Sequence, residues 1–83
     1  MTDSRKISSK IDDLLSERDE GRTICPSEVA RALGGEDWRD LMQPVRDVAA
    51  TRAQRGDLVV TRKGVPVDPQ DPGGPIRLGR PPS

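Results

Sequence analysis

Apolar residues near the start of the chain recur at helical spacing and lie on one helical face. They follow one another at steps of four, three and one, with charged and serine residues between them: Ile7, Ile11, Leu14 and Leu15. This pattern is typical of an amphipathic helix that buries one stripe. We therefore predict a helix over about residues 3–19, ended by Gly21 in the left-handed conformation.

A second, shorter helix is predicted to begin at Pro26. Residues 23–25, Thr-Ile-Cys, precede a proline, which favours an extended backbone. Pro26 suits the first helical position, because the N–H of that position has no partner inside a helix. Val29, Ala30 and Leu33 form the buried face, and two glycines at 34–35 end the helix.

A third helix is predicted from near Asp37 to about Gln54, with Gly56 ending it. Trp38 and the apolar residues that follow it recur at three- and four-residue steps. Pro44 interrupts this pattern, because a proline removes a backbone donor and crowds the preceding turn. Either the helix kinks at Pro44, or a short helical turn ends one residue earlier and a new helix starts there.

The later part of the chain predicts β structure. Residues 58–62 are rich in β-branched side chains and form the clearest strand. A tight turn at Lys63–Gly64 leads to a returning strand at 65–67, in which Pro66 must face an unpaired edge because it has no N–H. Residues 76–78 are short but can pair as a last strand.

The order of these elements predicts a winged helix-turn-helix fold. This fold is mainly α with a small β-hairpin, and it consists of three helices plus a C-terminal wing made by the hairpin. We place one domain over residues 3–78 and a disordered tail over 79–83, because residues 68–83 hold five prolines and three glycines.

Several short motifs together resemble a small bacterial domain family of unknown function that is regarded as winged-helix-like. They are residues 23–33 (Thr-Ile-Cys-Pro-Ser-Glu-Val-Ala-Arg-Ala-Leu), Trp38-Arg39, Met42, residues 44–46 (Pro-Val-Arg), 61–64 (Thr-Arg-Lys-Gly), 66–69 (Pro-Val-Asp-Pro) and 74–78 (Gly-Pro-Ile-Arg-Leu). The resemblance covers about residues 7–78. It implies the fold, and it implies no reaction, ligand or catalytic residue.

Composition narrows the function further. The chain has 83 residues, no histidine, one cysteine and a single aromatic residue, Trp38. A chain of this length and composition can form one small aliphatic core. Histidine, the commonest metal ligand and proton shuttle, is absent. We therefore expect no enzyme activity, no cofactor and no metal site. The longest apolar runs are short, so we expect neither a membrane span nor a secretory signal, and a cytoplasmic location.

The charges are unevenly divided, which points to an anionic partner. Residues 1–42 contain seven basic and ten acidic residues, a balance of −3, and residues 43–83 contain seven basic and four acidic residues, a balance of +3. In winged-helix proteins the third helix enters the major groove of duplex DNA and the wing contacts the backbone. The candidate nucleic-acid-binding residues are Arg39, Gln43 and Arg46 on one face of the third helix, with Arg62 and Lys63 at the hairpin tip.

A plainer interpretation is that these residues form a solvated surface with local ion pairs. Asp40 and Asp47 are close enough in sequence to partner Arg39 or Gln43, and such exposed pairs contribute at most about 1 kcal/mol. The alternative function is a protein–protein interaction or dimerisation module, since a neutral but dipolar surface suits a protein partner or a second copy.

Three other residues have competing interpretations. Cys25, just before a helix, is either a reactive thiol or, as we favour, a buried cysteine that acts as a small apolar residue. Trp38 is predicted to anchor the core between the second and third helices, with a partner contact as the alternative. Arg77 either pairs with Asp68 or Asp71 to hold the loop, or faces an anion.

Overall fold

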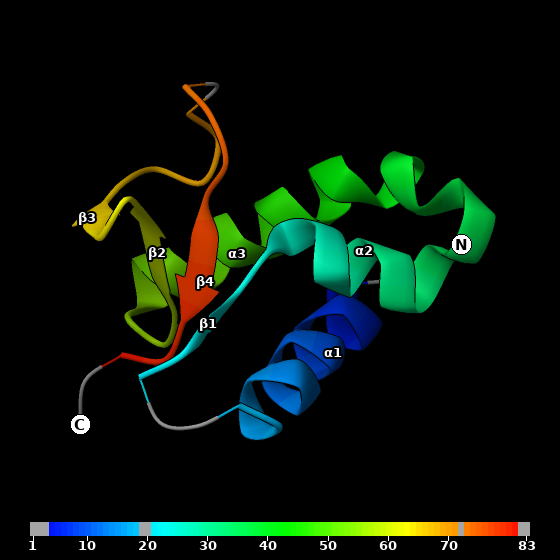
Figure 1. The fold of residues 1–83 in the computed structure, drawn as a ribbon, viewed down its shortest axis with the longest axis horizontal. Helices are drawn as coiled ribbons and strands as arrows, with labels where there is room; N and C mark the ends of the chain where they lie inside the picture. The colour runs from blue at the N-terminus through cyan, green and yellow to red at the C-terminus, as the bar shows by residue number, and fades with distance from the viewer. Residues whose placement is uncertain (1–3, 19–20, 72, 82–83) are drawn as a thin grey trace.

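The structure, a computed structural model, describes residues 4–18, 21–71 and 73–81. Its elements are α1 (Ser4–Ser16), β1 (Thr23–Ile24), α2 (Pro26–Gly34), the 3-10 helix η1 (Gly35–Leu41), α3 (Met42–Arg55), β2 (Val59–Arg62), β3 (Val65–Pro66) and β4 (Arg77–Gly79). Figure 1 shows the sheet at one end of the molecule and η1 at the other. The prediction of a mainly helical chain with a small amount of β structure is confirmed.

Helix α1 has the buried stripe that the sequence predicts. Ile7, Ile11 and Leu15 are buried on its inner face, and Leu14, the fourth predicted member, is partly buried against the core. The helix ends at Ser16, whose hydroxyl donates to the Asp13 carbonyl at 2.7 Å. It is therefore shorter than the predicted 3–19, of which residues 3 and 19 lie outside the described ranges. Gly21 has a positive φ of 86°, but it stands in the connection to β1 rather than at the helix end.

Helix α2 begins and ends where the sequence predicts. Pro26 occupies its first turn and Gly34 is its last residue. Val29 and Ala30 are fully buried, while Leu33 is partly buried against the same core. A Cβ atom at Gly34 would lie 2.9 Å from Leu41 Cδ1, so the absence of a side chain lets η1 fold back closely against the end of α2.

The helix predicted from Asp37 is divided into two elements. Asp37 has a non-helical ψ of 21° inside η1, and the α-helical backbone starts only at Met42. Pro44 is the third residue of α3, where the backbone N–H of any residue lacks an intrahelical partner. Of the two predicted alternatives, a new helix starts near Pro44 and no helix kinks there. The new helix begins at Met42, two residues before the proline. Gly56 follows the last residue of α3, as predicted.

The strands form one antiparallel sheet in the order β1-β4-β2-β3. Leu78 of β4 is paired with Ile24 of β1 and with Val60 of β2, and all three side chains are buried. The last strand thus lies inside the sheet, and the predicted hairpin is only part of it. Strand β4 extends through Gly79, so the predicted disordered tail over 79–83 is wrong at its first residue. Residues 82 and 83 of that tail lie outside the described ranges.

The β2–β3 hairpin has the predicted tight turn. Lys63 and Gly64 both have positive φ, 52° and 81°. Positive φ at both central residues matches the twist of two paired strands, and glycine adopts it without strain. β3 is an edge strand, so Pro66 faces an open edge as predicted, and Val65 beside it is 61% exposed.

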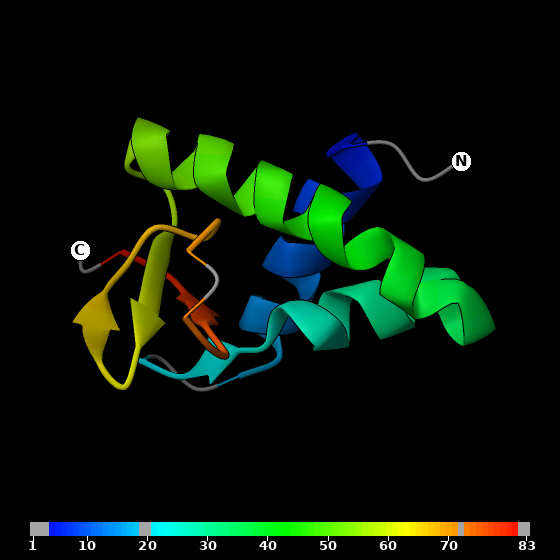
Figure 2. The same cartoon turned by 90° about the horizontal axis from the view of Figure 1, so that it is seen from above.

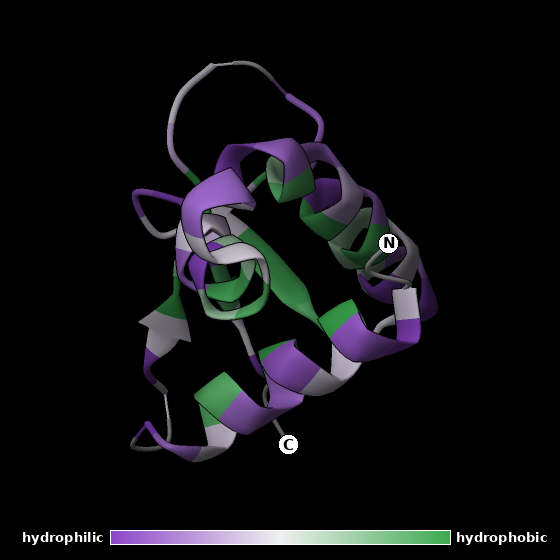
Figure 3. Cartoon of the chain, turned by 90° about the vertical axis from the view of Figure 1, so that its right-hand side faces the viewer, coloured by the Kyte–Doolittle hydropathy of each residue, from purple (hydrophilic) through white to green (hydrophobic). Residues whose placement is uncertain are grey.

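The core lies between the helices and one face of the sheet. Its buried members come from α1, α2, α3, the strands, and the residues that directly precede β2 and β4, Leu58 and Ile76. Figure 2 shows α3 along one side of the molecule and α2 with β1 along the other, and Figure 3 shows the apolar positions turned toward the space between them. No helix in the described ranges is long and apolar enough to cross a membrane.

Candidate nucleic-acid interface

Arg39 lies in η1, where it contacts the tryptophan. Its guanidinium carbon is 4.7 Å from the centre of the Trp38 ring, and that of Arg31, from α2, is 4.5 Å away. Trp38 is half-buried and packs against the core, which confirms its predicted role as an anchor. Both arginines are exposed, and neither forms an ion pair with a carboxylate in the described part of the chain. Cation–π contact fixes their positions while their N–H donors stay available.

Gln43 has its donors engaged by the protein itself. Its Nε2 atom donates to Asp47 Oδ1 and to Gln70 Oε1, both at 2.9 Å, and Gln70 Nε2 donates to Asp47 Oδ1 at 2.7 Å. Hydrogen bonds from Gln43 and Gln70 lower the pKa of Asp47 below its usual value. The predicted pairing of Gln43 with Asp47 is confirmed, and Gln43 can contact a base only after these bonds break.

Arg46 lies in the first half of α3 and is half-buried. It makes no hydrogen bond or ion pair with the residues that the structure describes, so its guanidinium donors are free. Arg39 and Arg46 are not two turns apart on one α-helix, since the chain changes from a 3-10 to an α-helix between them. They flank the same junction instead.

Arg62 holds the loop that follows β3. Its Nη2 atom donates to the carbonyls of Asp71 (3.2 Å) and Gly74 (3.0 Å), and its Nη1 atom lies 3.5 Å from Asp71 Oδ1. The side chain is only 19% exposed, and its Nε is buried without a partner. Arg62, rather than Arg77, therefore fastens the loop to the sheet.

Arg77 binds elsewhere. It donates to Thr23 Oγ1 (2.9 Å) and to the Thr23 carbonyl (3.0 Å), and it makes a short contact with Cys25 Sγ. The predicted pairing of Arg77 with Asp68 or Asp71 is therefore wrong. Arg77 lies on β4, which pairs with β1, so its side chain reaches Thr23 of β1 and Cys25 directly after that strand instead of the loop.

Cys25 precedes α2 and is half-buried. Its backbone N–H donates to Glu28 Oε2 at 2.9 Å, which caps the start of the helix. Its sulfur faces the Arg77 guanidinium. The prediction of a buried, apolar cysteine is therefore wrong, because the thiol is half-buried and lies beside a charged guanidinium.

Lys63 lies apart from the other candidates. It is exposed in the β2–β3 turn. Figures 1 and 2 both place this hairpin at the end of the molecule opposite η1, and the longest dimension of the molecule is 32 Å. The structure therefore brings Arg39 and Arg46 to one junction, ties Gln43 and Arg62 into internal networks, and leaves Lys63 at a distance.

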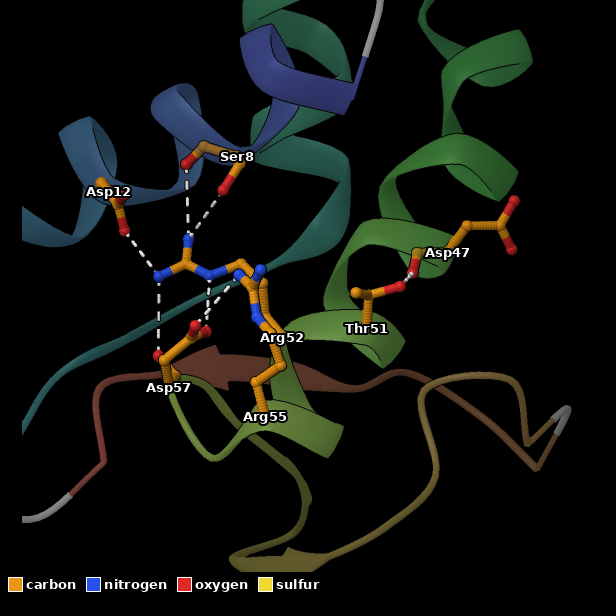
Figure 4. A network of polar contacts seen from close by, with 7 residues as sticks. All are labelled: Ser8, Asp12, Asp47, Thr51, Arg52, Arg55 and Asp57. Carbon is orange, nitrogen blue, oxygen red and sulfur yellow. Dashed lines mark hydrogen bonds and ion pairs between the residues drawn. The ribbon is translucent and has the colours of Figure 1, made fainter.

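A polar network centred on Arg52 joins residues that no sequence pattern connects (Figure 4). Arg52 Nε donates to Asp57 Oδ1 at 2.8 Å, its Nη2 lies 2.9 Å from Asp12 Oδ1, and its Nη1 is 3.3 Å from Ser8 Oγ. Arg55 also pairs with Asp57, at 3.0 Å. No local spacing rule connects Ser8 or Asp12 with Arg52, because 40 or more positions separate them along the chain. The network joins α1 to the end of α3.

The described residues contain no cluster of metal ligands. Within residues 4–18, 21–71 and 73–81, no three side chains of the types Cys, Asp and Glu lie close enough together to hold a metal ion.

The chain folds into a small, mainly helical domain with a four-stranded antiparallel sheet at one end. It belongs to the family described as "Protein of unknown function (DUF3253)", whose model matches residues 4–81. This match confirms the resemblance to a small family of unknown function. A search of curated proteins found none that matches the chain.

Proposed function

We propose that the chain is a non-enzymatic winged-helix module that binds duplex DNA at the α2–η1–α3 junction. The element order and the antiparallel pairing of β4 with β1 and β2 support this interpretation. In this fold the second helix of the helix-turn-helix pair presents its N-terminal residues to the major groove. The corresponding part of this chain is the end of η1 and the start of α3.

The observation that carries the proposal is the pair of unengaged arginines at that junction. Arg39 and Arg46 keep free guanidinium donors, whereas Arg52 and Arg62 donate to the protein. A free, planar guanidinium suits a phosphate or the edge of a guanine. Lys63 is too far away to share their contact, and we assign it at most a separate backbone contact.

Duplex titration at low salt tests this proposal. A fluorescently labelled duplex is titrated with the full chain and with Arg39→Ala and Arg46→Ala, and anisotropy is followed. Each substitution is expected to weaken binding about fivefold or more, equivalent to roughly 1 kcal/mol, because each removes one charged contact. The emission of Trp38, the single tryptophan, reports on the same site in the unsubstituted chain.

Arg22→Ala is the matched control. Arg22 is exposed in the connection between α1 and β1, so its removal lowers the charge equally without touching the junction. Its affinity should equal that of the unsubstituted chain. Absence of binding at high protein concentration, or equal losses in all three variants, would contradict a site at the junction.

A second candidate is self-association through the edge of the sheet. Strand β3 is an open edge, and Val65 on it is the large hydrophobic residue that the described chain leaves exposed. Unpaired strand edges are ready templates for pairing with a second copy. Light scattering that reports a dimer at high salt, lost in Val65→Lys, would favour this candidate.

A further inference from the structure

A groove lies between α1 and α3, away from the η1 turn. Its volume is about 360 Å³, within the range of roughly 300–1,000 Å³ that small-molecule sites occupy. One wall comes from the first turns of α1 and the other from the middle and end of α3, with Val48 as an apolar part of the lining. Figure 4 shows Arg52 of α3 reaching across to Ser8 and Asp12 of α1.

Arginines and hydroxyl groups dominate the polar lining. Arg5, Arg52 and Arg55 line the groove, and Asp47 is the one carboxylate among its lining residues. Asp12 and Asp57, which neutralise Arg52 and Arg55, are not part of the lining. Ser4, Ser8 and Thr51 add hydroxyls.

The donors of these groups are not equally free. Arg5 is exposed and has no ion pair or hydrogen bond with a described residue. Arg55 uses only Nη2 toward Asp57 among the described residues, so its other nitrogens stay available. Arg52 is fully engaged, and its Nη1 donates to Ser8 Oγ, which leaves the Ser8 O–H free to donate outward. Arg52 therefore positions Ser8 rather than binding a ligand itself.

The carboxylate of Asp47 is hydrogen-bonded to residues outside the groove lining. It accepts hydrogen bonds from Gln43 and Gln70, and Thr51 Oγ1 donates to the Asp47 carbonyl at 3.2 Å. The groove thus offers two guanidiniums and at least one hydroxyl donor beside an apolar patch. Guanidiniums match the oxygens of phosphate, and a phosphate monoester presents three acceptor oxygens and close to two negative charges.

We propose that this groove binds a small phosphate monoester with an apolar body, with Arg5 and Arg55 on the phosphate and Val48 under the apolar part. This site is separate from the DNA contact at Arg39 and Arg46. A small effector that occupied it would touch both α1 and α3.

Phenyl phosphate titrated into the full chain tests the proposal by amide NMR. Saturable shifts are expected at Ser8, Val48 and Thr51, with a dissociation constant near or below about 1 mM. Phenol and inorganic phosphate, each with half of the recognised features, should bind at least about fivefold more weakly. Arg5→Gln and Arg55→Gln should each weaken the binding of phenyl phosphate by a similar factor, while Arg22→Gln should leave its affinity unchanged.

Several outcomes would overturn this site. They are the absence of saturable shifts, binding by phenol equal to that of phenyl phosphate, or full affinity in Arg5→Gln with an unchanged melting temperature. Duplex DNA provides a further arm: if it shifts the same three amides and displaces phenyl phosphate, the groove holds backbone phosphate instead. Failure of DNA binding at Arg39 and Arg46 leaves the phenyl phosphate result unaffected, so the two proposals fail separately.

Discussion

Arg52 shows how one residue can join distant segments. Its side chain is only 11% exposed, yet it carries a charge that two carboxylates meet, Asp12 at 2.9 Å and Asp57 at 2.8 Å. Burial works against its charge, but hydrogen bonds from Arg52 to Asp57 and Asp12 outweigh this cost and raise its pKa. Because both carboxylates are exposed, solvent screens these ion pairs and limits how much they stabilise the fold.

The pH dependence of stability follows from the same network. The hydrogen bond from Arg52, with the charges of Arg52 and Arg55, lowers the pKa of Asp57 below 3.8. A carboxylate whose pKa is lower in the folded chain stabilises it above the unfolded pKa, and this contribution is lost as the pH falls through the folded pKa. We therefore expect the melting temperature to fall between about pH 5 and pH 2, and Asp57→Asn to reduce that fall.

The control for this prediction is Asp13→Asn. Asp13 is exposed on α1, and its carboxylate makes no ion pair with a described residue. Its substitution should leave the acid limb of the stability curve unchanged, and the curves of the unsubstituted chain and Asp57→Asn should approach each other at the acid end. An Asp57→Asn variant with the full acid limb would show that the network does not act on stability.

At the scale of elements, the loop between β3 and β4 depends on a side chain from β2. Arg62 donates to two carbonyls of this loop, at Asp71 and Gly74. Gln70, in the same loop, bridges to Gln43 and Asp47 of α3. The loop is therefore fastened at one end to the sheet and at the other to the helix.

Removing the Arg62 contact should loosen this loop. In Arg62→Leu we expect faster amide hydrogen exchange at Gln70, Gly73 and Gly74, with a loss of roughly 1 kcal/mol in global stability, because two charge-assisted hydrogen bonds disappear. Lys63→Leu, one residue away in the exposed turn, is the control and should leave the exchange rates unchanged. Exchange rates equal in Arg62→Leu and the unsubstituted chain would show that another contact holds the loop.

Local patterns predicted the elements well because local physics decides them. Pro26 at the start of α2, Gly56 after α3 and the Lys63–Gly64 turn follow from backbone preferences that single residues express. The division of the third helix was harder to predict, since it depends on the close approach of Leu41 to Gly34. The central place of β4 was also beyond local reasoning, because pairing across some 50 positions has no periodic signal.

At the scale of the whole molecule, equal numbers of basic and acidic residues do not determine which basic side chains stay free to bind a partner. The chain has 14 basic and 14 acidic residues, and only sequence position distinguishes the candidate binding residues from the other charges. In the folded chain Gln43 and Arg62 donate to other residues of the protein, and Lys63 lies at the end of the molecule opposite η1. Which arginines find carboxylates is decided by three-dimensional contacts, so the sequence could name the candidates but could not select among them.

The salt dependence of duplex binding tests the central claim most directly. A plot of the logarithm of the association constant against the logarithm of salt concentration has a slope set by the number of neutralised phosphates. If Arg39 and Arg46 each meet one phosphate, the slope should become shallower by about 1 in Arg39→Ala and in Arg46→Ala, and stay the same in Arg22→Ala. A slope near zero, or one that neither junction substitution changes, would contradict duplex recognition at the α2–η1–α3 junction.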